Sequence, residues 1–228
     1  MGKRQINLSK WQDFRGKNEG VLIYLDTAPS TLLPVRDVLD ELGKGFQTEP
    51  NYETGTYNFI GNQNSQICNS TYKNRKRYLF FGTSYQGEAP GFTGKYLIHG
   101  YLRIDKYFDA KKRHMHNWME NQAESQSPDC VDLKESMAFY SEEMNFYALE
   151  DCFELTESIM KGWGYKGRVA KHMKLTFDEA KTAELLEHFK DKPLANDAYI
   201  ERVEKLDSEK EKILEEALES QEDDDEEW

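Results

Sequence analysis

The sequence is poor in cysteine and has no long hydrophobic run. Its three cysteines, Cys68, Cys130 and Cys152, are an odd number and none lies in a CxxC pair, which excludes a disulfide framework and a zinc ribbon. The longest apolar run, Val21 to Leu25, is far shorter than the roughly 18 residues that a membrane span needs. Met1 to Lys10 is too polar for a secretory signal. We therefore expect a cytoplasmic protein that does not contact a membrane.

Motifs that mark common enzyme classes are also absent. The sequence has no GxGxxG, P-loop, GxSxG or HExxH pattern. His114 and His116 with Cys130 or Cys68 match none of the usual spacings of zinc ligands. We predict no metal ligand, no cofactor and no catalytic residue, so that the protein is a binding protein rather than an enzyme.

Carboxylates keep an enzymatic alternative open. Leu25–Ala28 reads Leu-Asp-Thr-Ala after an apolar strand and resembles the Asp-Thr-Gly/Ala element of dimeric aspartic proteases over only four residues. An enzyme acting on a nucleotide would need folding to bring together carboxylates such as Asp26, Glu150 and Asp151. No spacing in the sequence selects these three residues.

Charge is divided unevenly along the chain. The sequence has 42 acidic and 30 basic residues, a net charge of −12. Thr176 to Trp228 contains 20 of the acidic and 7 of the basic residues, so this part carries −13 and Met1 to Leu175 carries +1. The low overall pI therefore does not exclude a polyanionic partner for the first 175 residues.

Hydrophobic patterns predict a strand-rich body over residues 1–175. Val21–Leu25 indicates a buried strand, and Leu33–Leu42, with Pro34 near its start and Gly43 after it, indicates a helix. Gln47–Asn74 is predicted as loop apart from Tyr57–Ile60.

The clearest strand signals follow. Arg77–Gly82 is aromatic, and Lys95–Phe108 alternates with period two. This alternation places Tyr96, Ile98, Leu102 and Ile104 on one face and His99, Tyr101 and Arg103 on the other. We expect the two segments to pair antiparallel. Further strands are predicted at Met137–Tyr140 and Phe146–Leu155, separated by a turn at 141–143, and a short helix at His116–Gln122.

The C-terminal part is predicted to be helical. Thr176–Glu179 has the pattern of a capping box, which places Phe177, Leu185, Leu186 and Phe189 on the apolar face of a helix that ends before Pro193. A second helix is expected from Asn196. The predicted organisation is a body over 1–175, helices over 176–220 and a disordered acidic tail over 221–228.

Three basic clusters interrupt the neutral body, and each lies beside aromatic residues. Basic side chains neutralise phosphates and aromatic rings stack on bases, so this combination suits a nucleic-acid surface. The alternative is solvated charge in turns beside aromatic residues of the core. The predicted binding residues are Arg75, Lys76, Arg77, Lys111, Lys112, Arg113, Trp118, Trp163, Tyr165, Lys166, Arg168 and Lys171.

The loop Gly82–Gly94 has four glycines, more than a simple hairpin turn needs. Such a loop allows the backbone to approach a flat ligand. We include Thr83, Ser84 and Tyr85 in the predicted site as hydrogen-bonding groups and a stacking ring. A connection without a binding role is the alternative.

Two segments carry a resemblance to a known superfamily. Tyr78–Ser84 followed by Lys95–Lys106, a strand, a loop and a strand with an internal glycine, resembles the PUA-like superfamily, which includes EVE, ASCH, YTH and nucleotide-modification-associated domains. The segments Met137–Tyr140 and Phe146–Leu155 resemble its closing strands. The resemblance implies an α+β fold with a small, mostly antiparallel PUA-like β-barrel, flanking helices and a pocket for a nucleobase, often a modified or flipped one.

These observations lead to one main functional hypothesis and one alternative. The main hypothesis is binding of a nucleic acid or nucleotide, with recognition of a modified base through an aromatic-lined pocket and a basic surface. The alternative is a non-enzymatic interaction or regulatory protein, of the kind that phages encode. In that case the acidic tail mimics nucleic acid or binds a protein partner.

Overall fold

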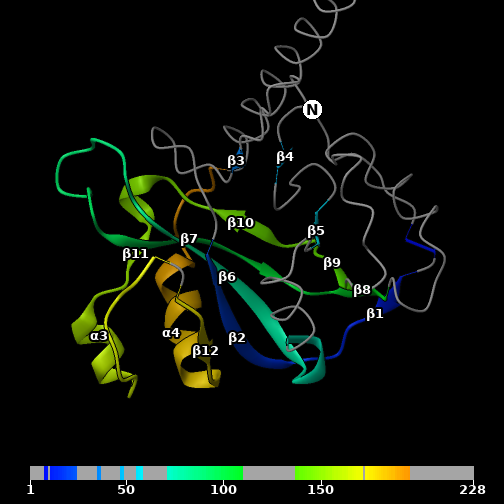
Figure 1. Ribbon diagram of the computed structural model, residues 1–228. Helices are drawn as coiled ribbons and strands as arrows, with labels where there is room; N and C mark the ends of the chain where they lie inside the picture. Colours follow the sequence, from blue (N-terminus) through cyan, green and yellow to red (C-terminus); the bar gives the residue numbers. More distant parts are fainter. Residues whose placement is uncertain are drawn as a thin grey trace, which may run out of the picture.

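The computed structural model describes residues 8–9, 11–24, 35–36, 47–48, 55–58, 71–109, 137–171 and 173–195 (Figure 1). These residues form a mixed α+β fold that consists mostly of sheet. The central sheet has the strand order β10 (Met144–Phe146), β7 (Tyr96–Arg103), β6 (Lys76–Ser84), β2 (Lys17–Tyr24) and β12 (Leu175–Phe177), and β11 (Phe153–Glu154) also pairs with β7.

A smaller sheet packs beside the central one. Its order is β1 (Gln12–Asp13), β8 (Lys106–Asp109), β9 (Met137–Tyr140) and β5 (Thr56–Asn58). A separate pair consists of β3 (Val35–Arg36) and β4 (Gln47–Thr48). The helical elements are η3 (Leu149–Asp151), α3 (Glu157–Gly162) and α4 (Glu179–Phe189).

The predicted pairing of the two aromatic segments is confirmed. β6 and β7 run antiparallel, from Tyr78 opposite Arg103 to Ser84 opposite Tyr96. The predicted strand at Val21–Leu25 is confirmed over Val21–Tyr24 as part of β2, which runs parallel to β6, and Leu25 lies outside the described residues. Because β2 and β6 are parallel, their last residues, Tyr24 and Ser84, reach the same edge of the sheet, here called the carboxyl edge.

The two sheets share an interior. The chain passes from β7 into β8 and from β9 into β10, so bent strands connect them. Aromatic and aliphatic side chains from both sheets fill the space between, including Phe81, Tyr57 and Phe139, all at most 1% exposed. The strand order of the described residues does not close into a barrel.

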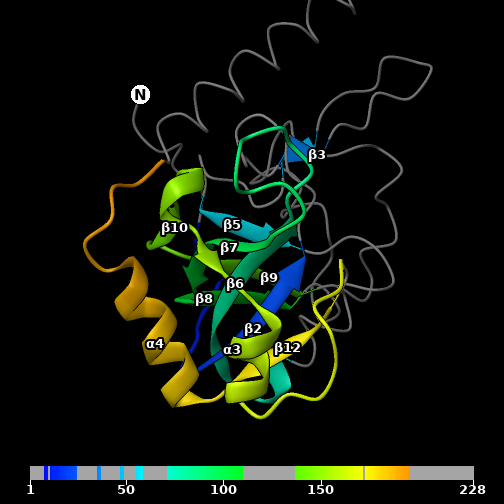
Figure 2. The same cartoon turned by 90° about the vertical axis from the view of Figure 1, so that its left-hand side faces the viewer.

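Helices cover the opposite face of the central sheet. Figures 1 and 2 show α3 and α4 on the same side of this sheet. Phe80, Ile98 and Phe177 from the sheet pack there with Met160 of α3 and Leu185 and Phe189 of α4. Because both faces are covered, neighbouring residues such as Phe80 and Phe81 are both fully buried, which explains the continuous apolar runs of β2 and β6.

A bulge in β7 overturns the predicted assignment of faces. Phe81 lies opposite Gly100 and Gly82 opposite Ile98, so His99 is the extra residue. Beyond the extra residue of a bulge, every side chain of the strand lies on the opposite face of the sheet from the one that simple alternation predicts. Tyr96 and Ile98 therefore pack on the helix side, whereas Leu102 and Ile104 point into the space between the sheets, and Tyr101 joins Tyr96.

The predicted capping box is also wrong. Thr176 lies in β12, and the N-cap of α4 is Asp178, whose Oδ1 accepts a hydrogen bond of 3.0 Å from the backbone N–H of Lys181. The predicted apolar helix face is correct for Leu185 and Phe189, which are buried, but Phe177 belongs to the strand. The boundary drawn after Leu175 falls inside β12, and residues 176–195 pack with the body.

Other predictions need local correction. Val35 and Arg36 form a strand with β4, where a helix was expected, and the segment 47–74 contains β4, β5 and a helical turn at 71–73. The strand expected over Phe146–Leu155 is interrupted by η3. The predicted strand over Met137–Tyr140 is confirmed. The predicted helices at 116–122 and beyond 196, and the acidic run at 222–227, lie outside the described residues.

Candidate functional site

The basic turn, Arg75–Arg77, lies where β6 begins and is held by contacts within the chain. Lys76 Nζ lies 2.9 Å from Glu19 Oε2, and an Arg77 guanidinium nitrogen lies 3.9 Å from Asp105 Oδ1. The Arg75 guanidinium lies over the ring of Tyr72, 5.1 Å from its centroid. All three cations therefore take part in local ion pairs or ring contacts.

The second predicted cluster lies outside the described residues. This applies to Lys111, Lys112, Arg113 and Trp118, and equally to Asp26, Cys68, Cys130, His114 and His116.

The loop after β6 packs as a small core of its own. Tyr85 is 3% exposed and packs against Leu97, so its ring offers no stacking face at the surface. Thr83 is 2% exposed. The Ser84 hydroxyl and carbonyl oxygens each accept a hydrogen bond of 3.1 Å from the Gln86 side-chain amide. Of the three predicted loop residues, only Ser84 lies within reach of the carboxyl edge without being fully buried.

Trp163 and Tyr165 are packing residues in this structure. The Trp163 ring stacks on Phe153, with centroids 5.8 Å apart and planes 10° apart, and its indole N–H donates to Glu184 Oε2 at 2.8 Å. The Tyr165 hydroxyl donates to the Thr176 backbone oxygen on the outer edge of β12. Burial raises the pKa of Tyr165 to about 12. Neither ring is presented for stacking on a base.

The third cluster, here called the basic segment (Lys166–Lys174), differs from the basic turn. Lys166, Arg168, Lys171 and Lys174 are all exposed. The ion pairs found among the described residues include neither Lys166 nor Arg168. Since no acidic side chain of the described part neutralises these two cations, they are available to an anionic ligand.

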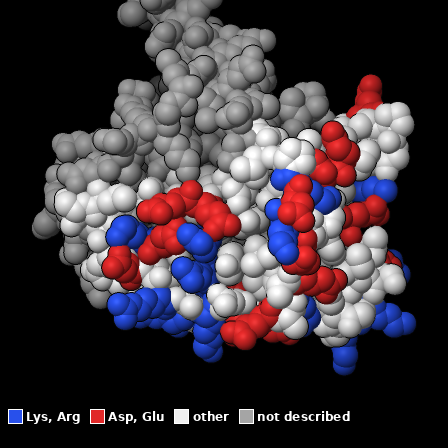
Figure 3. All heavy atoms as spheres, turned by 180° about the vertical axis from the view of Figure 1, so that it is seen from behind, with Lys and Arg blue, Asp and Glu red and all other residues white. Residues whose placement is uncertain are grey.

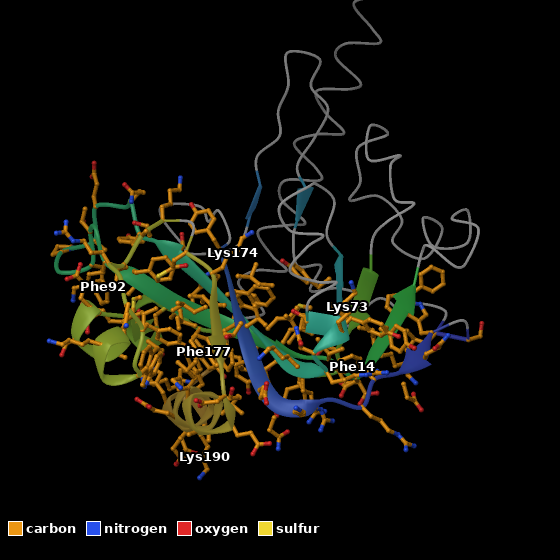
Figure 4. The ribbon with its side chains drawn as sticks, turned by 60° about the horizontal axis from the view of Figure 1, so that its bottom comes forward. Phe14, Lys73, Phe92, Lys174, Phe177 and Lys190 are labelled. Carbon is orange, nitrogen blue, oxygen red and sulfur yellow. The ribbon has the colours of Figure 1, made fainter. Side chains whose placement is uncertain are left out.

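Apolar residues of the basic segment fix it over the carboxyl edge. Val169 and Met173 pack against the helix-side core while the cations point outward. The segment leads directly into β12, whose Leu175 pairs with Leu22 of β2. Figure 4 shows Lys174 at the start of β12, close to β2, and Phe177 further along between the sheet and α4. The cations thus lie next to the last residues of β2.

Aromatic side chains lie beneath the basic segment. Lys171 Nζ lies over the ring of Tyr24, 5.4 Å from its centroid, as in a cation–π contact. Tyr96 opens β7 opposite Ser84 and is 3% exposed. Burial, with a further contribution from Tyr24, raises the pKa of Tyr96, so its hydroxyl keeps its proton at neutral pH.

A glycine allows Tyr96 to reach this position. A Cβ at Gly82 would lie 2.7 Å from Tyr96 Cε1 and 3.0 Å from both Tyr96 Oη and Leu22 Cδ1. The Tyr96 ring therefore crosses β6 over Gly82 toward β2. Neither Tyr24 nor Tyr96 was predicted as a site residue. The sequence signal for Tyr96 is a glycine near the end of one aromatic strand, followed by a tyrosine at the start of the next strand.

Charges elsewhere on the described surface are mixed. Seen from behind, lysine and arginine side chains lie among aspartate and glutamate side chains (Figure 3). Ion pairs of the described residues include Arg103 with Glu143 at 2.8 Å. This face therefore presents no large area of a single charge sign in its described part.

The described residues supply little for catalysis. No group of three or more histidine, cysteine, aspartate or glutamate side chains is placed to hold a metal in this part of the chain. Asp151 Oδ1 lies 3.7 Å from Lys192 Nζ, so this carboxylate is paired. Burial raises the pKa of the Cys152 thiol to about 12, which leaves it protonated and a poor nucleophile.

Comparison with known proteins adds no family. Neither a protein-family model, nor a curated protein, nor a solved structure matches the chain. Within the described part, no helix has the length and apolar character needed to cross a membrane.

Proposed function

We propose that the chain binds a nucleotide or a nucleic acid at the carboxyl edge of β2 and β6, without chemistry of its own. The observation that carries this proposal is the position of the basic segment. Its exposed Lys171 lies over the Tyr24 ring, and the described ion pairs leave Lys166 and Arg168 without an acidic partner. Cations beside an aromatic ring suit a ligand that combines phosphate with a flat base.

We further propose that the body is a PUA-like domain. The antiparallel β6–β7 pair, the internal Gly100 and the bent strands that join the two sheets support this assignment. The described strands leave the sheet open, so the barrel itself is part of the proposal. The carboxyl edge is then the place where a base, including a modified one, is recognised.

The test is a binding titration of the full-length protein with labelled single-stranded DNA, single-stranded RNA and duplex DNA over a salt series. We expect binding at low salt that weakens as salt rises, with a slope of about −0.7 per phosphate contact for single strands. No binding of any of these probes at low salt, even after truncation following Ser220, would contradict the proposal.

The alternative is an interaction protein whose acidic C-terminal part replaces nucleic acid. It is supported by the sequence, which places 20 of 42 acidic residues in Thr176 to Trp228. An anionic segment tethered to a basic surface has a high effective concentration there. Under this alternative the tail, rather than a nucleic acid, occupies the basic segment.

A further inference from the structure

The hydroxyl group of Tyr96 lies buried at the carboxyl edge. Its oxygen is buried and has no hydrogen-bond partner among the described residues. By contrast, the Tyr101 hydroxyl donates to Glu143 Oε1 at 2.9 Å and accepts from Asn145 Nδ2 at 2.8 Å. An unmade hydrogen bond at a buried hydroxyl destabilises a protein, so its retention requires an explanation.

Packing alone does not require this hydroxyl. The Tyr96 ring belongs to the helix-side core with Leu22 and Ile98, where a phenylalanine ring would make the same apolar contacts. The oxygen lies over Gly82, at the carboxyl edge, and close enough to Tyr24 for that phenol to contribute, after burial, to the raised pKa of Tyr96. The polar atom thus lies next to the ring and the cations of the proposed site.

The segment that covers this edge has little backbone hydrogen bonding to hold it in place. It has no regular secondary structure from Gly164 to Lys174 in its described residues, and Gly164 and Gly167 adopt positive φ values of 83° and 139°. Met173 N–H donates to Ala170 O at 3.2 Å within the segment itself. A ligand that displaced this segment to reach Tyr96 would break no strand ladder, only the packing of Val169 and Met173 against the helix-side core.

We propose that the Tyr96 hydroxyl is the group that hydrogen-bonds the base edge of a bound nucleotide. The base stacks on Tyr24, where Lys171 now lies, and the phosphate is bound by Lys166, Arg168 and the displaced Lys171. This inference rests on the proposed function and adds a specificity-determining residue to it. The nucleotide is either free or part of a single strand, because both present the same base edge and phosphate.

Tyr96→Phe tests the inference, with Tyr101→Phe as the matched control. Because the Tyr96 hydroxyl is unpaired in the free protein, Tyr96→Phe should leave the melting temperature unchanged or raise it, and should weaken nucleotide binding about tenfold or more. Tyr101→Phe breaks two hydrogen bonds and should lower the melting temperature while binding is retained. If the Tyr96 hydroxyl stabilised the fold instead, Tyr96→Phe would lower the melting temperature.

The probes separate base recognition from phosphate binding. The common nucleoside monophosphates and a short single strand are titrated beside a strand of the same length that lacks bases. Tyr96→Phe should weaken binding of the base-containing probes and leave the abasic strand unaffected. An effect on the single strand but not on free nucleotides assigns the site to polymers, and the reverse assigns it to free nucleotides.

Two results overturn the inference in different ways. Unchanged affinity of Tyr96→Phe for base-containing probes, while the wild-type protein binds them, removes Tyr96 from the site and leaves the proposed function intact. Failure of the wild-type protein to bind any probe overturns the proposed function and the inference together.

Discussion

The positively charged side chains at the two ends of the parallel pair β2 and β6 have different partners. At the amino end, the basic turn Arg75–Arg77 has Glu19 and Asp105 as acidic partners and the Tyr72 ring beneath Arg75. At the carboxyl end, the basic segment keeps its cations exposed, and Lys171 lies over an aromatic ring. The clusters thus differ in their acidic partners, which Lys76 and Arg77 have and which Lys166 and Arg168 lack in the described part of the chain.

This difference indicates which cluster serves the fold and which serves a ligand. Cations that already have carboxylate partners gain little from a phosphate, because a local ion pair must be broken first. Exposed cations such as Lys166 and Arg168, which have no carboxylate partner in the described part, lose only water and counterions. We therefore expect the basic turn to contribute to stability and the basic segment to contribute to binding.

The largest effect on stability is expected at Asp105, which holds the amino end together. Its side chain is 17% exposed and accepts from Arg103 Nε at 3.1 Å and from the Glu142 backbone N–H at 2.9 Å, beside Arg77. Asp105→Ala should lower the free energy of unfolding by about 2 kcal/mol, after allowance for solvent screening.

Chemical denaturation measures this loss, and Glu88→Ala, at an exposed position, is the control. Binding of single strands by Asp105→Ala, measured where the variant is folded, should equal that of the wild type. A selective loss of binding would assign the amino end to the site and reverse the comparison.

The next largest effect on stability is expected at His99 of β7, the strand that pairs with β6. Its ring is fully buried against Phe146 and has no hydrogen-bond partner in the described part of the chain, and burial lowers its pKa from 6.5 to about 3. The unfolded chain binds a proton at higher pH than the folded chain. Stability is therefore complete above pH 6.5 and falls as pH decreases toward 3, by roughly 1 kcal/mol per pH unit.

His99→Leu should remove this part of the pH dependence. Denaturation between pH 7 and pH 4.5 is the measurement, and the two proteins should diverge as the pH falls. Parallel curves would show that His99 does not titrate as its burial requires. Neither end of the sheet pair is altered by this substitution, so nucleic-acid affinity at pH 7 should be unchanged.

The smallest effect is expected from truncation after Ser220, which removes the acidic run Glu222–Glu227. If this run competes for the basic segment, the truncated protein should bind single strands a few-fold more tightly at low salt, where screening is weakest. The difference should vanish at high salt. Equal affinities across the salt series would reduce the run to a solubilising role.

Sequence patterns were sufficient for β2, β6 and β7 of the central sheet, and insufficient for β12 and for the site. The β6–β7 pair was predictable because aromatic and alternating residues mark strands. The faces of β7 were not, because a bulge at His99 depends on its partner strand and leaves no trace in the alternation. Likewise, aromatic residues beside cations do not reveal whether their rings are exposed, and Tyr85, Trp163 and Tyr165 are packed or hydrogen-bonded.

The carboxyl edge depends on contacts between distant residues. Lys171 lies over Tyr24, and Tyr96 crosses Gly82, because β12 returns to pair with β2 and β7 pairs with β6. β2 and β12 are far apart in the sequence, and the contact of Tyr96 with Gly82 depends on the register of β6 and β7. Of the residues at this edge, Ser84 was predicted from the glycine-rich loop, and Lys166, Arg168 and Lys171 were predicted from their charge.

The most direct test compares two variants that each remove three positive charges. One replaces Lys166, Arg168 and Lys171 with alanine, and the other replaces Arg75, Lys76 and Arg77. Their affinities for one single-stranded probe are measured over the same salt series. We expect the first variant to bind weakly and to lose about 2 from the slope of log affinity against log salt concentration, since about three phosphate contacts are removed. The second should keep the wild-type slope. Equal losses in both variants, or a larger loss in the second, would contradict the assignment of the carboxyl edge as the binding site.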